Sequence, residues 1–285
     1  MQLINNRTFG GERPLFGLED VRLENIEVTD GESAVKQCRN VEAYHCRFFG
    51  KYPWWHVEGC TIGHCYFAPG SRSAIWYTRG LKMHDCIIDG PKFFREMEDA
   101  ELERVTINDA DETFWKVDGL RLHDVTLRGG TYPFFLSRNL YVDGLRSDAK
   151  YVFQYCRNVE IHHAEITTKD SFWECENVTI YDSTLHGEYL GWHSRGLRLV
   201  NCHLSGEQLL CHAHDLVLEN CTFDGSCDRL FEYSTLRADI RGHVENIKNP
   251  TSGHIIADSI GSVTLDGFVR QPADCRIEIR KNGNL

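Results

Sequence analysis

Apolar and polar residues follow one another along this chain in a phrase that returns every 19 to 21 residues. Its clearest copies are LRLVNCHL at 197–204 and LVLENCTF at 216–223, in which apolar or small residues stand first, third, sixth and eighth. We number the first of these positions 0, so the others are positions 2, 5 and 7. A repeat this regular predicts a solenoid, whose units bury their apolar sides by stacking on one another. Position 0 falls on Val21, Val41, Cys60, Leu81, Ala100, Leu120, Leu140, Val159, Val178, Leu197, Leu216 and, in a weaker copy, Leu236.

Each repeat contains three short segments with the character of a β-strand. Positions 0 and 2, then 5 and 7, alternate with strand period, and a bend at positions 3 and 4 separates them. A third segment comes earlier, because positions −6 and −3 carry no charge and should face inward. Position −1 is usually Gly, Asn or Asp, which tolerate left-handed backbone angles, so a tight turn is expected there. The pattern predicts an all-β fold, a single-stranded parallel β-helix of about twelve coils.

A leucine-rich repeat is the alternative solenoid, since it also places Leu at positions 0, 2 and 7. The period of 19 to 21 residues lies at or below the range of that repeat, and the Asn stands one place early. The aromatic third segment ends in a turn residue and leaves no room for a helix. The β-helix is therefore the preferred interpretation.

The repeat divides the chain into one continuous domain with three parts. An N-terminal cap segment is expected at residues 1–20, β-helix coils at 21–243, and C-terminal coils with closing strands at 244–285. The formal charge of −11 argues against nucleic acid and anionic membranes as partners. The N-terminal residues do not resemble a signal peptide, and no apolar stretch approaches the length of a membrane helix, which predicts a cytoplasmic protein.

The cysteines fit the repeat as small buried groups. Five of the twelve occupy position 5, and three more occupy position −3, where Val, Ala, Ser and Thr alternate with them. A cytosolic chain keeps such thiols reduced, and no Cys spacing here matches a zinc module. We therefore expect core thiols and no metal centre. The eight are Cys46, Cys65, Cys86, Cys202 and Cys221 at position 5, and Cys38, Cys156 and Cys175 at position −3.

The repeat, its stacked Asn positions and its short coils resemble the pectin-lyase-like right-handed parallel β-helix superfamily. The segments FGGERPLF at 9–16 and IIADSIGSVTLDG at 255–267 resemble the two ends of an uncharacterised bacterial branch of it. The resemblance covers essentially the whole chain and implies the right-handed β-helix. Polysaccharide lyases, glycoside hydrolases and epimerases belong to that superfamily. The polygalacturonase motifs and the Asp cluster of a calcium-dependent pectate lyase are absent from this sequence.

Two consecutive positions, −5 and −4, carry charges in some copies and should point outward. Position −5 holds five of the six tryptophans, and large exposed aromatics in a line suggest an interaction surface. Flat indole faces beside acids, amides and imidazoles suit pyranose rings, so this aromatic stripe predicts an oligosaccharide site. Its expected substrate-binding residues are Trp55, Trp76, Trp115, Trp173 and Trp192 at position −5, and Tyr77, Glu96, Lys116 and Tyr155 at position −4.

Four polar residues at position −4 are candidates for catalysis. Glu174, His193, His212 and Glu232 stand on consecutive coils, at a spacing that suits general acid and base pairs. Metal binding by the two histidines and a glutamate is an alternative. A second cluster, His56 with Tyr77, Glu96 and Lys116, stands nearer the N-terminus. His45, His64, His84 and His123, by contrast, are interpreted as surface residues around the bend.

Three functions fit these observations. The first is a carbohydrate-binding or carbohydrate-active protein, of the glycoside hydrolase or polysaccharide lyase kind, with an oligosaccharide as its partner and no cofactor. The second is a non-catalytic structural or protein-interaction scaffold. The third is self-association into a homo-oligomer through the exposed end coils.

Overall fold

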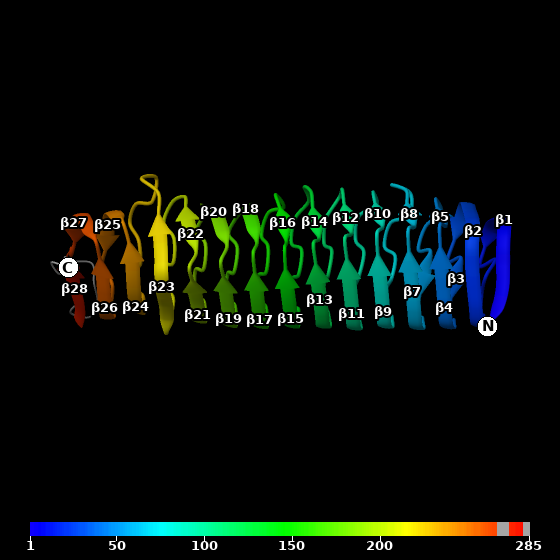
Figure 1. Ribbon diagram of the computed structural model, residues 1–285, viewed down its shortest axis with the longest axis horizontal. Coiled ribbons are helices and arrows are strands. Elements are labelled where there is room, and N and C mark those ends of the chain that lie inside the picture. Colours follow the sequence, from blue (N-terminus) through cyan, green and yellow to red (C-terminus); the bar gives the residue numbers. More distant parts are fainter. Residues whose placement is uncertain (267–273, 282–285) are drawn as a thin grey trace. The chain divides into compact units, whose positions relative to one another are not determined.

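The computed structural model describes residues 1–266 and 274–281, which fall into two compact units, 1–149 and 150–285. Both units are all-β parallel solenoids, and the part of the chain that is described contains no helix (Figure 1). It therefore also contains no helix long and apolar enough to cross a membrane. Together the units contain about fourteen turns rather than the expected twelve. The fold class read from the repeat is confirmed.

Unit 1 begins with a coil that the repeat pattern did not register. Strand β1 (Gln2–Glu12) lies in the expected N-terminal cap segment and pairs in parallel with β2 (Glu19–Glu32). The remaining strands of unit 1 are β3 (Val35–Lys36), β4 (Arg39–Tyr44), β5 (Arg47–Phe48), β6 (Trp54–Trp55), β7 (Glu58–Gly63), β8 (Tyr66–Phe67), β9 (Arg79–His84), β10 (Ile87–Ile88), β11 (Glu98–Glu103), β12 (Thr106–Ile107), β13 (Asp118–His123), β14 (Thr126–Leu127), β15 (Arg138–Asp143) and β16 (Arg146–Ser147).

Unit 2 continues the same alternation of a longer strand, which carries positions 0 and 2, and a shorter one. Its strands are β17 (Arg157–His162), β18 (Glu165–Lys169), β19 (Glu176–Tyr181), β20 (Thr184–Glu188), β21 (Arg195–Val200), β22 (His203–Ser205), β23 (Leu216–Phe223), β24 (Thr235–Arg241), β25 (His243–Lys248), β26 (Ser252–Ala257), β27 (Ser259–Thr264) and β28 (Asp274–Ile279). Strand β24 carries Leu236, the weaker copy of position 0, and the four strands after it lie almost entirely in the C-terminal part, where further coils and closing strands were expected.

The register of the strands is the register of the repeat. In unit 1, Val21 pairs with Val41, Val41 with Cys60, and Cys60 with Leu81. In unit 2, Val178 pairs with Leu197. Because side chains alternate across a strand, this register stacks all inward residues into columns and keeps all polar residues outside.

The two predicted bends are confirmed by left-handed backbone angles. Position −1 has positive φ in every coil from Asp20 to Asp215, and it is always Gly, Asn or Asp there. Position 4 also has positive φ, as at Asn25, Asn201 and Asn220. The amides at position 4 form a ladder in which Asn220 Nδ2 donates to Asn201 Oδ1 at 2.9 Å, and Asn201 Nδ2 donates to Asp182 Oδ1 at 2.9 Å. These side chains are exposed, so the ladder lies on the surface.

The third segment is regular strand only in β3 and β6. Further along unit 1 the inward residues of position −6 have positive φ, as at Phe94 (59°), Phe114 (57°) and Phe134 (67°). Their rings are fully buried and stack at centroid distances of 4.8 and 4.9 Å. The aromatic column is therefore inward, as predicted, although the backbone departs from strand geometry to place it there.

The cysteines are core residues, as expected. All twelve are free, eleven are buried, and Cys275 is partly exposed. In unit 1 the thiols of position 5 lie on successive coils, where the backbone N–H of Cys46 contacts Cys65 Sγ at 3.4 Å and that of Cys65 contacts Cys86 Sγ at 3.4 Å. The eight thiols that the pattern assigned to the interior are all buried.

Candidate functional site

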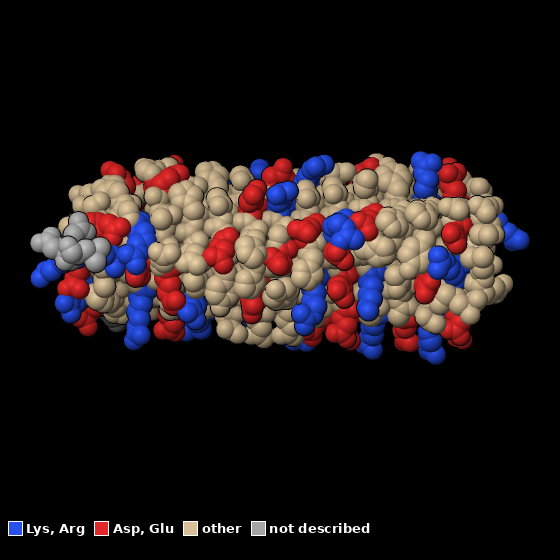
Figure 2. All heavy atoms as spheres, viewed as in Figure 1, with Lys and Arg blue, Asp and Glu red and all other residues tan. Residues whose placement is uncertain are grey.

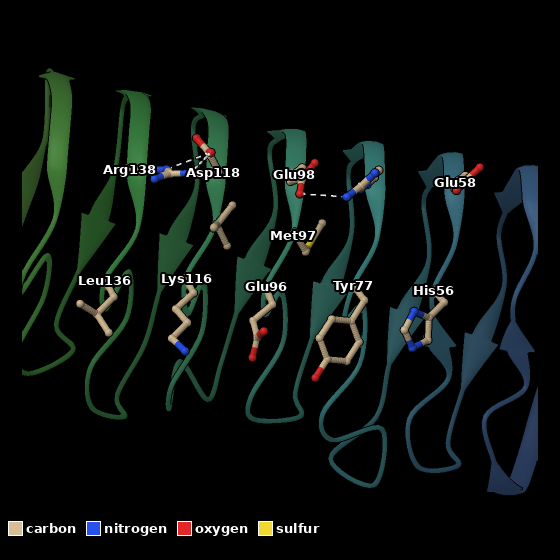
Figure 3. Close-up of a pocket in the computed structure, with 12 residues that line it drawn as sticks. His56, Glu58, Tyr77, Glu96, Met97, Glu98, Lys116, Asp118, Leu136 and Arg138 are labelled. Atoms are coloured by element: carbon tan, nitrogen blue, oxygen red, sulfur yellow. Dashed lines mark hydrogen bonds and ion pairs between the residues drawn. The ribbon is translucent and has the colours of Figure 1, made fainter.

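A groove runs across unit 1 between two outward columns of side chains. One wall is position −4, the other is position −2, and the inward position −3 forms the floor (Figure 3). The enclosed space is about 620 Å³. Its lining residues are His56, Tyr77, Glu96, Lys116 and Leu136 on the first wall, Glu58, Arg79, Glu98, Asp118 and Arg138 on the second, and Met97 and Val117 below.

The first wall is built on a strained backbone. His56, Tyr77, Glu96, Lys116 and Leu136 have φ between 49° and 59°, and all five side chains are exposed. This left-handed step explains how two consecutive positions, −5 and −4, both point outward. Residues other than Gly and Asn lose about 1–2 kcal/mol in this conformation. The wall contains neither, so its side chains are kept at a cost in stability.

The second wall is made of ion pairs between coils. Arg79 Nη2 lies 3.1 Å from Glu98 Oε1, and Arg138 Nε lies 2.9 Å from Asp118 Oδ2. The hydrogen bond from Arg138 lowers the pKa of Asp118. On the face shown in Figure 2, acidic and basic side chains likewise interleave and do not gather in one patch. Such exposed pairs contribute little stability, but they neutralise this wall.

The first wall keeps its polar groups available. The Tyr77 ring stacks on the His56 imidazole at 4.8 Å with an interplanar angle of 15°. Within residues 1–266 and 274–281, the Glu96 carboxylate and the Lys116 ammonium take part in no ion pair or side-chain hydrogen bond. In the same range Tyr77 Oη also makes none. The groove therefore offers an acid, a cation, a phenol and an imidazole, with the exposed Leu136 side chain as an apolar contact.

The aromatic stripe of unit 1 lies beside this wall and is partly buried. Trp55 Nε1 donates to the Ser73 carbonyl at 2.9 Å, and Trp76 Nε1 donates to the Lys92 carbonyl at 2.9 Å. The two indoles stack at 5.2 Å with an angle of 15°. The sequence predicted an exposed stripe, and this is corrected, because the segment leading into each next coil covers the indole edge.

Cations complete the stripe in unit 1. The Arg95 guanidinium lies 4.9 Å from the Trp76 ring and 4.8 Å from the Trp115 ring, and the Trp115 and Phe135 rings pack at 4.4 Å with a tilt of 34°. Arg95 also pairs with Glu112 at 2.6 Å. This alternation of indole and guanidinium resembles a cross-coil brace more than an open binding platform.

Unit 2 brings the two predicted catalytic histidines together. The imidazoles of His193 and His212 stack at 4.8 Å with an angle of 17°, and Trp173 and Trp192 lie 5.7 Å apart beside them. Burial, followed by the neighbouring His193, lowers the pKa of His212. A neutral His212 near pH 7 can accept a proton.

The two predicted catalytic glutamates are placed differently from each other. Glu174 is exposed at position −4, next to Trp173. Glu232 is only 15% exposed, and its Oε1 lies 3.1 Å from Lys248 Nζ, so an ammonium already neutralises it. Tyr155, predicted to bind substrate, has an exposed side chain on the same column.

Three residues of the outward column at position −5 are inside the protein, contrary to expectation. Gln154, Cys211 and Phe231 are at most 8% exposed. Gln154 Nε2 donates to the Asp170 carbonyl at 2.9 Å, and the Cys211 thiol contacts the Arg229 carbonyl at 3.5 Å. The same covering segments that shield the indoles enclose these smaller or wholly apolar side chains.

The sequence named part of the groove and missed the rest. Tyr77, Glu96 and Lys116 were predicted to bind substrate, and His56 was placed in their cluster. The ion-paired wall does not stand out in the sequence, because alternating charges at one position of a repeat are typical of a solvated surface ladder. The signal that could have identified the groove is the inward position −3 between two outward columns, which leaves a channel between them.

Comparison with solved structures finds chains of low identity. The A-module of mannuronan C-5 epimerase AlgE4 from Azotobacter vinelandii is 11% identical, with 98% of this chain and 90% of that chain covered and a TM-score of 0.40. The AlgE6 A-module from the same organism is 8% identical, with 99% of this chain and 91% of that chain covered and a TM-score of 0.38. The pentapeptide repeat protein HetL from the cyanobacterium Nostoc sp. strain PCC 7120 is 10% identical, with 71% of this chain and 85% of that chain covered and a TM-score of 0.30. Likeness at this level says nothing about substrate or reaction.

Comparison with curated proteins gives no match. A family model, in contrast, aligns with nearly the entire sequence, from residue 2 to residue 278. That span contains both units and every residue of the groove. The chain belongs to the family described as "Protein of unknown function (DUF3737)".

Proposed function

We propose that the groove of unit 1 binds an oligosaccharide. The observation that carries the proposal is the contrast between its walls. One wall consists of ion-paired side chains, and the other presents His56, Tyr77, Glu96 and Lys116 without such partners among the described residues. Polar groups that are oriented but unused suit a ligand with many hydroxyls, because each can donate or accept a hydrogen bond.

The spacing of the wall supports the same ligand class. Its side chains come from successive coils about 4.8 Å apart, close to the length of one pyranose unit in an extended chain. The Tyr77 ring and the Leu136 side chain, 38% and 44% exposed, supply apolar surface for the C–H faces of a sugar. We also propose that the chain is a member of the pectin-lyase-like superfamily, which its repeat and its ends resemble. Membership is in line with a carbohydrate ligand.

We propose a catalytic site separate from the groove, at the pair His193 and His212 of unit 2. The lowered pKa of His212 keeps its imidazole neutral near pH 7, as a general base requires, and the exposed Glu174, one coil from His193, is the candidate acid. If the wild-type protein changes no oligosaccharide in a mixed panel, as analysed by chromatography of the products, this catalytic part is wrong. The binding proposal does not depend on it.

The alternative is a non-catalytic structural or protein-interaction scaffold. The aromatic stripe favours it, since the indole N–H groups of Trp55, Trp76 and Trp192 are bonded to the backbone and the rings of Trp55 and Trp76 stack between neighbouring coils. On this view the groove residues would contribute to a protein interface and would not discriminate among sugars.

The two functions are separated by titrating the full chain with a panel of neutral and acidic oligosaccharides in a calorimeter. We expect Tyr77→Ala and Lys116→Met each to weaken binding about tenfold, as expected for loss of one aromatic or charged contact of 1–2 kcal/mol. The matched control is Glu101→Gln, on the same unit but outside the groove, which should bind as the wild type does. Equal affinity in all four proteins, or no heat with any sugar, would refute the oligosaccharide site.

A further inference from the structure

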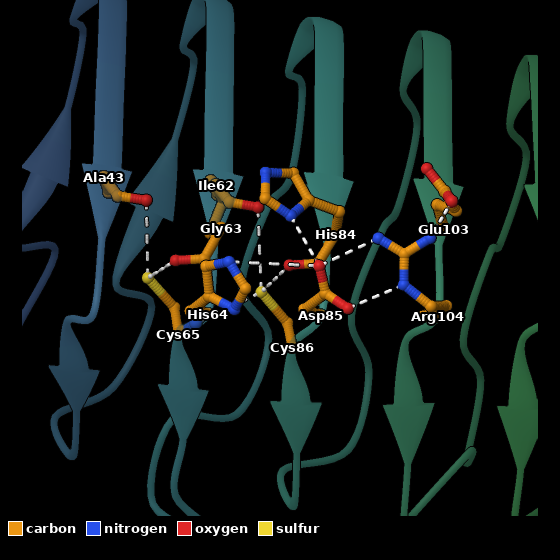
Figure 4. A network of polar contacts seen from close by, with 10 residues as sticks. All are labelled: Ala43, Ile62, Gly63, His64, Cys65, His84, Asp85, Cys86, Glu103 and Arg104. Carbon is orange, nitrogen blue, oxygen red and sulfur yellow. Dashed lines mark hydrogen bonds and ion pairs between the residues drawn. The ribbon is translucent and has the colours of Figure 1, made fainter.

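A cluster of metal-ligating side chains lies on the bend of unit 1, away from the groove. His64 comes from the bend after β7, His84 is the last residue of β9, and Asp85 lies in the bend that follows it (Figure 4). One nitrogen of each imidazole and one carboxylate oxygen lie within 4.8 Å of one another. His84 Nδ1 is 2.9 Å from Asp85 Oδ2, and His64 Nε2 is 4.0 Å from the same oxygen.

We propose that His64, His84 and Asp85 bind a divalent transition-metal ion of the zinc type. Two donors that share a tetrahedral zinc ion at bond lengths of about 2.0–2.2 Å lie about 3.3–3.6 Å apart. Asp85 Oδ2 lies 2.9 Å from His84 Nδ1 and 4.0 Å from His64 Nε2, on either side of this spacing, so small side-chain rotations bring the donors to it. Such small adjustments are open to these side chains, because they are between 28% and 48% exposed.

The chemistry of the donor set selects the kind of ion. Two imidazoles and one carboxylate suit zinc, cobalt or nickel better than calcium or magnesium, which prefer oxygen ligands. The cysteines that follow, Cys65 and Cys86, do not join the set. Their thiols point inward and contact the Gly63 carbonyl at 3.3 Å and the His84 carbonyl at 3.2 Å. Three protein ligands leave a coordination position for water or another ligand.

A glycine makes this arrangement geometrically accessible. Gly63 precedes His64 and occupies position 3, where the next coil has His84. A Cβ atom on Gly63 would lie 2.6 Å from His84 Cε1 and 2.7 Å from His84 Nε2, so the imidazole fills the space that a side chain would take. The absence of a side chain at Gly63 therefore lets the His84 ring approach its partner in the preceding coil.

One side chain opposes the metal. The Arg104 guanidinium donates to both Asp85 oxygens, at 2.7 Å from Nε and 2.9 Å from Nη2. It neutralises the carboxylate and repels a cation, so it competes with the ion for Asp85. If the three residues bind a metal ion, removing Arg104 should therefore raise the affinity for zinc. If Asp85 serves only its salt bridge with Arg104, removing Arg104 should bring no gain in zinc affinity.

The test uses the full chain without an affinity tag, reduced and free of metal, titrated with zinc chloride in competition with a chromophoric chelator. We expect one zinc ion per chain. His64→Gln and His84→Gln should each weaken binding by about 100-fold, and Gly63→Ala, which keeps every ligand, by about 10–100-fold, as supporting residues of metal sites do. Arg104→Gln should bind severalfold more tightly.

Two controls make the outcome decisive. His45→Gln removes an imidazole that stacks on His64 at 5.0 Å without belonging to the donor set, and His123→Gln removes one from position 3 two coils further along. Both should bind within about twofold of the wild type, with thermal melts verifying the fold of every variant. Cobalt bound to the wild type should lack thiolate charge-transfer bands. The site is refuted if no zinc binds, if the His64→Gln/His84→Gln double variant binds it as the wild type does, or if Arg104→Gln weakens binding.

Discussion

At the scale of single residues, left-handed backbone angles occur at positions −1 and −4 of the coil, which differ in the residues they hold. Position −1 meets the requirement with Gly, Asn or Asp, whose φ values are positive at little cost. Position −4 has the same backbone angle at His56, Tyr77, Glu96 and Lys116, which are poorly suited to it. The buried phenylalanines of position −6 share this angle, so it belongs to the coil as a whole and does not by itself mark a functional site.

Replacing Lys116 with Gly should therefore stabilise the protein, by up to about 1 kcal/mol, because Gly adopts φ of 53° without steric cost. The control is Lys82→Gly, in strand β9, where φ is not positive and Gly should destabilise by roughly 0.5–1 kcal/mol. Chemical denaturation monitored by circular dichroism gives both values. If the two variants lose stability alike, the first wall carries no backbone strain.

At the scale of elements, each coil is a longer strand, a bend and a shorter strand, held to its neighbours by ladder hydrogen bonds. The bend depends on two contributions, the left-handed angle at position 4 and the surface amide ladder. The ladder bonds are exposed to water, so each contributes only about 0.5–1 kcal/mol. The backbone angle is the larger contribution, since Ala in that conformation loses about 1–2 kcal/mol.

The double variant Asn201→Ala/Asn220→Ala should consequently lose about 3–6 kcal/mol of unfolding free energy, the sum of both contributions at two sites. Asn201→Gly/Asn220→Gly removes the same amides but keeps the backbone angle accessible, and it should lose at most about half as much. Urea unfolding measures the two side by side. Equal losses would mean that the amide ladder, rather than the backbone, stabilises the bend.

At the scale of the whole molecule, each unit is a stack in which a coil contacts mainly its neighbours, about 20 residues away along the chain. Stability in such a stack is a sum over coils and their interfaces. The interiors are continuous columns of apolar side chains and thiols, sealed enough that burial raises the pKa of Cys60, Cys211 and Cys227 to about 12.

Thiol labelling should therefore depend on the integrity of the whole stack. In the native protein at pH 8, a chromogenic disulfide reagent should react rapidly with at most the partly exposed Cys275, and with all twelve thiols after denaturation. A raised pKa leaves little thiolate to react, and burial keeps the reagent out. Rapid labelling of several native thiols, or native disulfides found by non-reducing mass spectrometry, would contradict the closed interior.

The sequence by itself determined the coil, the register and the inward columns, because a period of 19 to 21 residues admits one stacking of its apolar positions. It also located the two bends, since Gly, Asn or Asp occupies position −1 and often position 4. Three of the groove residues could also be identified from the sequence, as polar residues at an outward position: Tyr77, Glu96 and Lys116.

Only the tertiary structure decided what those outward positions do. Partial burial of Trp55 and Trp76 depends on the path of the segments that cover them, which no periodicity encodes. The availability of Glu96 and Lys116 depends on which charges find partners in adjacent coils. The approach of His84 to His64 depends on the missing side chain of Gly63. A repeat fixes positions along the coil, whereas exposure and pairing arise from contacts between coils, and those contacts exist only in the folded stack.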